Sequence, residues 1–258
     1  MRKSLAAAAV VAGTLGLPVL AALPASAATS GGQTYSATLS PVPLNGQTSA
    51  SGNLMLMLNG NSATITENAS GLASTFMGGP FPHVQHIHGG ADGVCPTASA
   101  DANHDGLITT TEGAPSYGPI LTTLSKSGGT TPADGTNTKT SPSGSSFQYS
   151  RTIQLDSATV QAIKGGTAVI VVHGLNPATA PKAATTEKSE LVPSLPQAAT
   201  APAICGKLVA SQMGSVPSGG AATGAGGTAG TQDVGLLAIG GMLLAGSGAY
   251  AARRFATR

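Results

Sequence analysis

The segment Asn53-Leu-Met-Leu-Met-Leu-Asn-Gly-Asn-Ser-Ala-Thr-Ile-Thr-Glu67 decides the fold class of this 258-residue chain. Two strand-like runs, 53–58 and 62–67, lie on either side of Asn59-Gly60. A tight hairpin turn needs positive φ at both central residues, and Asn-Gly is among the pairs that adopt it most readily. The segment therefore predicts an antiparallel β-hairpin.

Further strand-like segments occur on both sides of this hairpin, and only one segment has the character of a helix. The run Ala168-Val-Ile-Val-Val172 is continuously apolar, which predicts a fully buried strand. A short helix is expected over 158–163, where Asp156 or Ser157 can cap it and Gly165 can end it. Short strands with glycine-rich turns predict an all-β fold, an antiparallel Greek-key or immunoglobulin-like β-sandwich. The remaining predicted strands are 34–39, 84–88, 120–124, 147–155 and 208–211.

The N-terminal segment has the features of a secretory signal peptide. Residues 1–27 start with the basic pair Arg2-Lys3, continue through an apolar run and end in Ala25-Ser26-Ala27, the small-x-small pattern of a cleavage site. We therefore expect a secreted protein whose single folded domain spans 28–210. The Gly-, Ser- and Ala-rich stretch 211–232 is expected to be a flexible linker.

The C-terminal segment, 233–258, predicts attachment to the cell surface. It contains an uncharged run, 234–252, about as long as the roughly 20 residues with which a helix crosses a membrane. Arg253, Arg254 and Arg258 follow, and basic residues stay on the cytoplasmic side, so the domain is expected outside the cell. Substrates of sortases also end in an apolar segment and a basic tail. A transmembrane helix and attachment to the wall by a sortase both remain open.

The charge of the exported part argues against nucleic acid as a partner. The chain has twelve Lys and Arg against ten Asp and Glu, but two basic residues lie in the signal peptide and three in the tail. The remainder carries seven basic and ten acidic residues, a net charge near −3, which disfavours binding to nucleic acid or to an anionic membrane surface. The two cysteines, Cys95 and Cys205, predict one disulfide, as is usual for an exported domain.

The segment Asp101-Ala-Asn-His-Asp-Gly-Leu-Ile-Thr-Thr-Thr-Glu112 matches the twelve-residue calcium loop of EF-hands. That loop places oxygen ligands at positions 1, 3, 5, 7 and 12 and a glycine at position 6. The predicted ligands are therefore the side chains of Asp101, Asn103, Asp105 and Glu112 and the carbonyl oxygen of Leu107. Because Gly113-Ala-Pro115 follows, we expect any helix to end at Glu112 and the loop to be a lone structural calcium site.

Four histidines are candidate ligands for copper or zinc. His86 and His88 are two residues apart, so on a strand both rings lie on one face. His173 ends the apolar strand, and His83 lies three residues before His86. Imidazoles that converge from two strands suit copper or zinc. The alternative is that these histidines are buried and hydrogen-bonded to the backbone.

Two family resemblances follow from these motifs. The combination of His86-Ile-His-Gly-Gly90, a later Val-Val-His173 and a terminal Cys205-Gly-Lys-Leu-Val209 resembles the CHRD (chordin-type) domain of exported bacterial proteins, above all an actinobacterial group. The resemblance covers about residues 50–208 and includes Glu112-Gly-Ala-Pro-Ser-Tyr-Gly-Pro119. It implies an immunoglobulin-like β-sandwich with no assigned enzymatic activity.

The same landmarks resemble, more distantly, Cu/Zn superoxide dismutase, a Greek-key sandwich. That resemblance implies copper ligands at His86, His88 and His173 and a disulfide between Cys95 and Cys205. The dismutase also has a bridging histidine and three zinc ligands after its first cysteine, whereas this chain has only His104 there. It also has an arginine before its final cysteine, whereas no arginine occurs here between Arg151 and Arg253.

The sequence therefore predicts a surface-anchored binding or scaffold module with structural calcium and no catalytic residues, acting on an unidentified extracellular partner. The alternative is a copper protein of the dismutase type with an incomplete site. An adhesive or matrix protein is a third reading.

Overall fold

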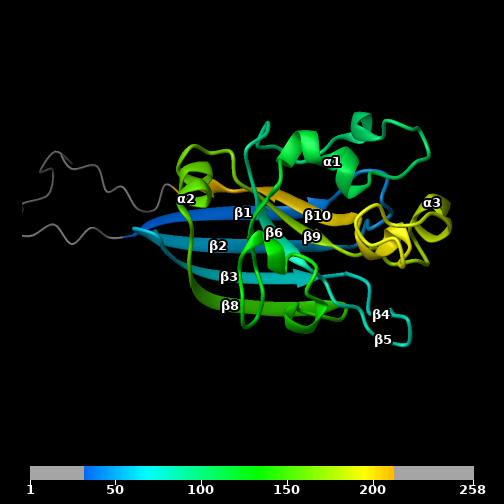
Figure 1. The fold of residues 1–258 in the computed structure, drawn as a ribbon, viewed down its shortest axis with the longest axis horizontal. Coiled ribbons are helices and arrows are strands. Elements are labelled where there is room, and N and C mark those ends of the chain that lie inside the picture. Colours follow the sequence, from blue (N-terminus) through cyan, green and yellow to red (C-terminus); the bar gives the residue numbers. More distant parts are fainter. Residues whose placement is uncertain (1–31, 212–258) are drawn as a thin grey trace, which may run out of the picture.

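The computed structural model describes residues 32–211 of the chain. The predicted signal peptide, most of the linker and the C-terminal segment lie outside the described residues. Within 32–211, no helix is long and apolar enough to cross a membrane. Figure 1 shows a mostly β structure with a few short helices at its margins, which confirms the predicted all-β class.

Nine strands form one open antiparallel sheet in the order β7-β6-β9-β10-β1-β2-β3-β8, with β11 paired to β1. A separate two-stranded ribbon joins β4 and β5. The strands are β1 (Gln33–Pro41), β2 (Ser51–Asn59), β3 (Ser62–Ser70), β4 (Thr75–Phe76), β5 (Gly79–Pro80), β6 (Gln85–His88), β7 (Ile120–Thr123), β8 (Ser146–Gln154), β9 (Val169–His173), β10 (Pro202–Lys207) and β11 (Val209–Ala210).

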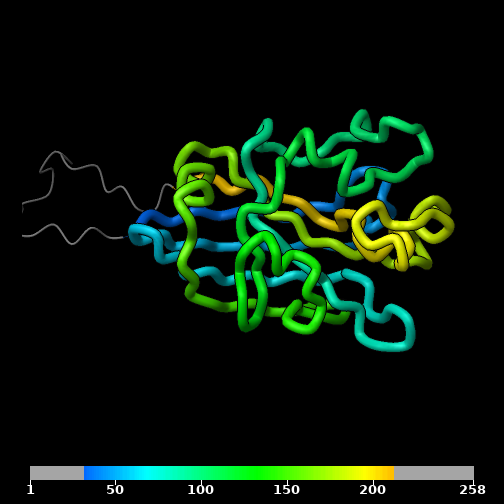
Figure 2. Tube along the Cα trace, in the orientation of Figure 1, coloured from blue at the N-terminus to red at the C-terminus, as the bar shows by residue number. Residues whose placement is uncertain are grey.

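Strand β1 joins two arms of the sheet. Along 33–39 it pairs with β2, and β2, β3 and β8 continue this first arm. At its end, Ser40 and Pro41 pair with Cys205 and Ile204 of β10, and β10, β9, β6 and β7 form the second arm. The sheet curls so that apolar side chains of both arms meet in one core. Figures 1 and 2 show both described chain ends at one end of the molecule and the β4–β5 ribbon and α3 at the other.

The predicted hairpin is confirmed, with its turn one residue later than expected. Asn59 pairs with Ser62, so the two central residues are Gly60 and Asn61. Gly60 has φ +59°, whereas Asn61 is not among the residues with positive φ. A glycine with positive φ at the first central position is typical of a type II′ turn, which suits the twist of the flanking strands.

The apolar strand β9 is buried on both faces, as predicted. Ile170 and Val172 point into the core between the arms. Val169 and Val171 point to the opposite face, where they pack with Ile108 and Tyr117 in a second apolar cluster. The helix α1 and the loop before it therefore cover the outer face of the second arm, and the residues on that face are also shielded from water.

The helices are short and begin at identifiable caps. Asp156 caps α2 through its side chain, which accepts a hydrogen bond from the Thr159 N–H at 2.7 Å. The expectation that helix ends at Glu112 is wrong: α1 continues to Tyr117 with Pro115 inside it. Thr109 and Glu112 form a capping box at its start, which compensates for the one hydrogen bond that Pro115 cannot donate. The helices are α1 (Thr110–Tyr117), α2 (Ser157–Lys164) and α3 (Lys182–Thr186), and the 3-10 turns are Ala98–Ala100, Pro132–Asp134, Thr138–Thr140 and Gln197–Ala199.

The predicted disulfide is confirmed between Cys95 and Cys205, whose Cα atoms are 5.8 Å apart. It ties the loop after β6 to β10 across 110 residues of sequence. Closing a loop of that length stabilises the fold by about 4 to 5 kcal/mol in the chain-entropy model. The bond also holds β10 beside the strands that carry the histidines.

Candidate metal centre

Three of the four candidate histidines come together on the outer face of the second arm. His86 and His88 lie on β6, and His173 ends β9, which pairs antiparallel with β6. His86 lies opposite Val171 and His88 opposite Val169 in this ladder. Since alternate residues share a face, His173 points to the same side as Val171 and therefore joins the other two rings.

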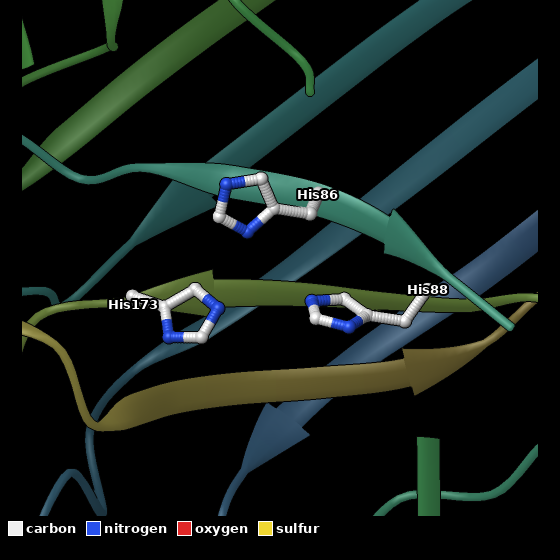
Figure 3. A group of neighbouring side chains, drawn as sticks. All are labelled: His86, His88 and His173. Carbon is white, nitrogen blue, oxygen red and sulfur yellow. The ribbon is translucent and has the colours of Figure 1, made fainter. Parts of the chain in front are cut away.

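The three rings surround one point. The ring centroids are 5.5 Å apart for His86 and His88, 5.1 Å for His86 and His173, and 6.0 Å for His88 and His173. One nitrogen from each ring can be chosen so that all three lie within 4.8 Å of one another. Figure 3 shows the rings gathered over β6 and β9. We call this set the three-histidine cluster; it is an arrangement that could hold a metal ion.

Backbone carbonyls hold one nitrogen of each ring. His86 Nε2 lies 2.9 Å from the Gly135 oxygen, His88 Nδ1 2.8 Å from the Gly118 oxygen, and His173 Nδ1 2.7 Å from the Thr200 oxygen. A carbonyl only accepts hydrogen bonds, so each of these nitrogens carries the proton. The other nitrogens, His86 Nδ1, His88 Nε2 and His173 Nε2, are buried and have no partner among the described residues.

Burial keeps the cluster neutral. It lowers the pKa of His88 to about 3 and that of His173 to about 4, and it lowers the pKa of His86 well below the ordinary value. The neighbouring His173 lowers the pKa of both other rings further, while their hydrogen bonds to carbonyls oppose the shift. At neutral pH each ring therefore has one N–H held by a carbonyl and one unprotonated nitrogen that can bind a metal ion. Histidine ligands in metal sites commonly have such a second partner, which orients the ring.

The helix α1 supports two of the three rings. The carbonyl of Gly118, at its C-cap, holds His88, and the ring of Tyr117 packs edge-on against His88 with centroids 4.6 Å apart. At the other end of α1, the Thr110 hydroxyl donates to the Thr200 oxygen at 2.7 Å, the same oxygen that holds His173. Gly118 has φ +86°, and a Cβ there would lie 2.1 Å from the Gly89 oxygen. Only glycine fits at this position.

Replacing Thr110 with valine is expected to weaken the affinity of the three-histidine cluster for an added metal ion about tenfold, the lower end of the loss usual when an outer-shell partner is removed. The shape of the side chain is kept, but the hydroxyl that anchors α1 to the Thr200 carbonyl is lost. The affinity for Cu²⁺ as a probe ion, measured by competition with a chelator, and the electron paramagnetic resonance (EPR) spectrum of the added Cu²⁺ check this. Thr110→Ser should restore both values, and Thr111→Val, on the exposed side of the same helix, should change neither. Equal affinities for Thr110→Val and the parent chain would contradict the assigned role.

A loop held by Arg151 supports the third ring. The Arg151 guanidinium donates to the Ser125 and Gly128 carbonyl oxygens at 2.8 and 2.7 Å. The same loop continues through a 3-10 turn closed by Thr131 and Asp134 and ends at Gly135, whose carbonyl holds His86. The position of His86 therefore depends on a strand of the first arm as well as on its own strand.

His83, the fourth candidate, lies outside the cluster. Its Nδ1 is 2.9 Å from the His173 carbonyl oxygen, and its Nε2 is 2.9 Å from the Ala73 carbonyl oxygen. The ring stacks on Phe81 with centroids 4.8 Å apart. Both nitrogens face carbonyl oxygens, so His83 supports the backbone of His173 and offers no free nitrogen in this arrangement.

The predicted calcium loop folds around its own side-chain oxygens. Asp101, which is buried, accepts hydrogen bonds from the N–H groups of Asp105 and Gly106 at 3.2 and 3.0 Å. Glu112 accepts from the Ala102 and Thr109 N–H groups at 3.0 and 2.9 Å. Glu112 therefore belongs to both the loop and the capping box of α1, so the loop is continuous with the helix that supports the cluster.

The supporting groups could not be found from the sequence, because three of them are main-chain carbonyls that any residue can supply. The one available signal was Gly118, in the Tyr-Gly-Pro motif before β7. Comparison of the chain with protein-family models and with curated proteins finds no match.

Proposed function

We propose that the protein binds one copper ion through His86, His88 and His173, in an exported chordin-type β-sandwich attached to the cell surface. One observation carries this proposal: three buried, neutral imidazoles each turn an unpartnered nitrogen toward the same point, while a carbonyl fixes the other nitrogen. Three buried polar atoms without partners are costly in a structural role. A metal ion would satisfy all three.

Copper is favoured over zinc by the chemistry of the donors. Imidazole binds both metals, but Cu²⁺ binds more tightly than Zn²⁺ to a given nitrogen site. A copper ion held by these three nitrogens would still be able to take up a small ligand. A bound copper ion would supply one-electron chemistry, while the protein residues orient the rings, exclude bulk water and keep the imidazoles unprotonated.

The copper proposal is tested by counting metals in the purified full-length chain. We expect one copper per chain after loading and an EPR spectrum with nitrogen coupling. Zinc offered in equal amount should be displaced by copper. Less than a tenth of a copper ion per chain, or copper removed by a weak chelator such as glycine, would reject the proposal.

We propose that a calcium ion bound by the loop 101–112 stabilises this loop and the helix α1. The support is the match of 101–112 to the calcium-loop pattern and its continuity with α1. We expect millimolar calcium to raise the thermal unfolding midpoint by several degrees, since a ligand at 100 times its Kd adds about 2.7 kcal/mol. Asp101→Asn should abolish most of that rise, whereas Asp92→Asn, an exposed aspartate elsewhere, should preserve it. If the unfolding midpoint responds neither to calcium nor to a chelator, calcium does not stabilise the fold.

Superoxide dismutation is a second candidate function. It is favoured because the His-x-His pair, the Val-Val-His histidine and the disulfide of the resemblance lie together in the second arm. A superoxide assay on the copper-loaded chain tests it. Because no arginine lies between 151 and 253 to attract the anion, we expect activity with weak dependence on ionic strength. Without activity, the binding or scaffold module remains the function, with copper as its ligand.

A further inference from the structure

Strand β8 is the last strand of the first arm and forms a free edge of the sheet. Figure 1 shows it along the margin of the sheet, in the direction of the long axis of the molecule. It pairs with β3 over all nine of its residues, and no segment of the described residues pairs with its other side. A free edge presents unpaired N–H and C=O groups to which another strand can bond.

The main-chain groups on the free side of β8 belong to its even-numbered residues. Leu155, directly after the strand, donates its N–H to the Asn61 oxygen at 2.8 Å. In an antiparallel ladder every second residue bonds to the same neighbour, so the odd-numbered residues of β8 bond to β3 and the even-numbered residues face away. All of the outward-facing residues are exposed: Ser146, Gln148, Ser150, Thr152 and Gln154.

Strand β8 lacks the features that commonly prevent edge strands from pairing. It contains no proline, and its ladder with β3 has no bulge. Its one charged side chain, Arg151, is directed to the loop of the second arm, where it binds the Ser125 and Gly128 carbonyl oxygens. The edge can therefore bond to an extended strand along its whole length.

The sequence of β8 is complementary to a second copy of itself. In an antiparallel pair centred on Ser150, all nine residues have an opposite residue, and all outward-facing N–H and C=O groups of both copies are paired. Phe147, which is half-buried, then lies opposite Ile153 of the second copy, and an aromatic side chain opposite a β-branched one is a favourable pair. Arg151 lies opposite Tyr149, so the charge does not face its own copy. Any other centre leaves part of β8 unpaired, and a centre at Arg151 also places two like charges opposite each other.

We propose that two copies of this chain associate by antiparallel pairing of their β8 edges about a two-fold axis at Ser150. The axis is perpendicular to the sheet, so it reverses the long axis of the molecule. Both described chain ends lie at one end of that axis (Figures 1 and 2), and the two copies therefore direct these ends in opposite directions. For chains attached by their C-terminal segments, this arrangement joins two facing surfaces, as an adhesive protein does. The pairing stands on β8 alone, whereas the joining of surfaces rests on the proposed surface attachment.

Sedimentation velocity of the metal-free full-length chain over a range of concentrations tests the pairing. We expect a reversible dimer with a dissociation constant in the micromolar range, because one pair of strands is a small interface. Ser150→Pro removes an N–H that does not bond to β3 and should weaken the dimer at least tenfold, whereas Ser150→Ala keeps the N–H and should not. Ser150→Lys places two ammonium groups opposite each other and should weaken the dimer without a proline. A parent chain that stays monomeric well above micromolar concentration, or dimers of equal strength in the parent, proline and lysine chains, would overturn the pairing.

A cysteine at the axis tests the register. The Cα atoms of such a directly opposite pair lie about 5.5 Å apart, within the range that a disulfide bridges. Because both native cysteines are already paired, Ser150→Cys should link two copies under mild oxidation by diamide. Gln148→Cys lies about 14 Å from its own copy in this register and should not link them. Equal cross-linking of the two variants would show that the pair is not centred on Ser150.

Beads that carry the full-length chain by its C-terminus test whether the two chain ends point in opposite directions. Beads with the parent chain should clump, and beads with Ser150→Pro should stay apart. If Ser150→Cys cross-links in solution but the parent beads do not clump, the joining of surfaces is wrong and the dimer stands. All of these measurements are made without metal, so a chain that binds no copper would reject the proposed metal site and leave their outcome unchanged.

Discussion

Replacing Glu67 with glutamine is expected to stabilise the fold by about 4 kcal/mol at pH 8 and by almost nothing at pH 4. Glu67 lies on β3 opposite Tyr149, with its side chain 1% exposed in the core. Neither carboxyl oxygen has a partner among the described residues. Burial raises the pKa of Glu67 from 4.5 to about 8.

The sign of the pH dependence follows from these two pKa values. Below pH 4.5 the carboxyl is protonated in the folded and unfolded chain alike, so it costs nothing. Between pH 4.5 and 8 the unfolded chain loses the proton while the folded chain retains it, and the free energy of unfolding falls by about 1.4 kcal/mol per pH unit. Above pH 8 the carboxyl is ionised in both states, so the difference is constant. Glutamine has nearly the same shape as glutamate and carries no charge. The Glu67→Gln variant therefore does not undergo this fall in the free energy of unfolding.

Urea unfolding of the metal-free chain at pH 4, 6 and 8 measures the effect as the difference between the Glu67→Gln variant and the parent. Taking that difference cancels the contribution of the buried histidines, whose lowered pKa values act in the opposite direction. Glu187→Gln removes the same charge from an exposed position and should show no such trend. A variant that is less stable than the parent at pH 8 would show that the Glu67 carboxylate has a partner in solution.

The sequence predicts those strands in which the order of apolar and polar side chains is enough to indicate the backbone conformation. The hairpin at 53–67 alternates between core and solvent, and the run at 168–172 has no polar side at all, so both strands were predicted. Strand β10 was not. It begins with Pro202, which a strand tolerates at its first residue, and it continues with Ala-Ile-Cys-Gly206, which shows no alternation of apolar and polar residues. Its burial between β1 and β9 makes it a strand.

The candidate metal centre also has a part that the sequence predicts and a part that it does not. The spacing of His86 and His88 places both rings on one face of any strand, and the end of the apolar run places His173 nearby. His83 was a candidate because it is close in sequence, but it precedes β6 and turns its ring to the carbonyls of His173 and Ala73. The length of α1 was not predictable from Pro115 alone, because a capping box and packing of Tyr117 against β9 stabilise the helix from both ends.

Replacing His173 with glutamine is expected to lower copper affinity at least a hundredfold, because two imidazoles on one strand cannot surround an ion as three do. Losing even an outer-shell partner costs 10- to 100-fold, and this change removes a ligand itself. The measurement is competition with a chelator of known affinity at pH 7. EPR should report one coupled nitrogen fewer.

The same variant separates ligation from packing through its response to acid. In the parent chain, burial lowers the pKa of His173 to about 4 from 6.5. The unfolded chain therefore gains a proton below pH 6.5 that the folded chain does not take up until about pH 4, and metal-free stability is lost across that window. Glutamine does not titrate, so His173→Gln should remove one histidine's share of the loss between pH 6.5 and 4, while His86 and His88 keep theirs. The variant should also lose tight copper binding. His104→Gln, at an exposed histidine outside the cluster, should do neither. If His173→Gln bound copper as tightly as the parent, the ion would lie elsewhere, and the three-histidine cluster would be a packing feature of the second arm.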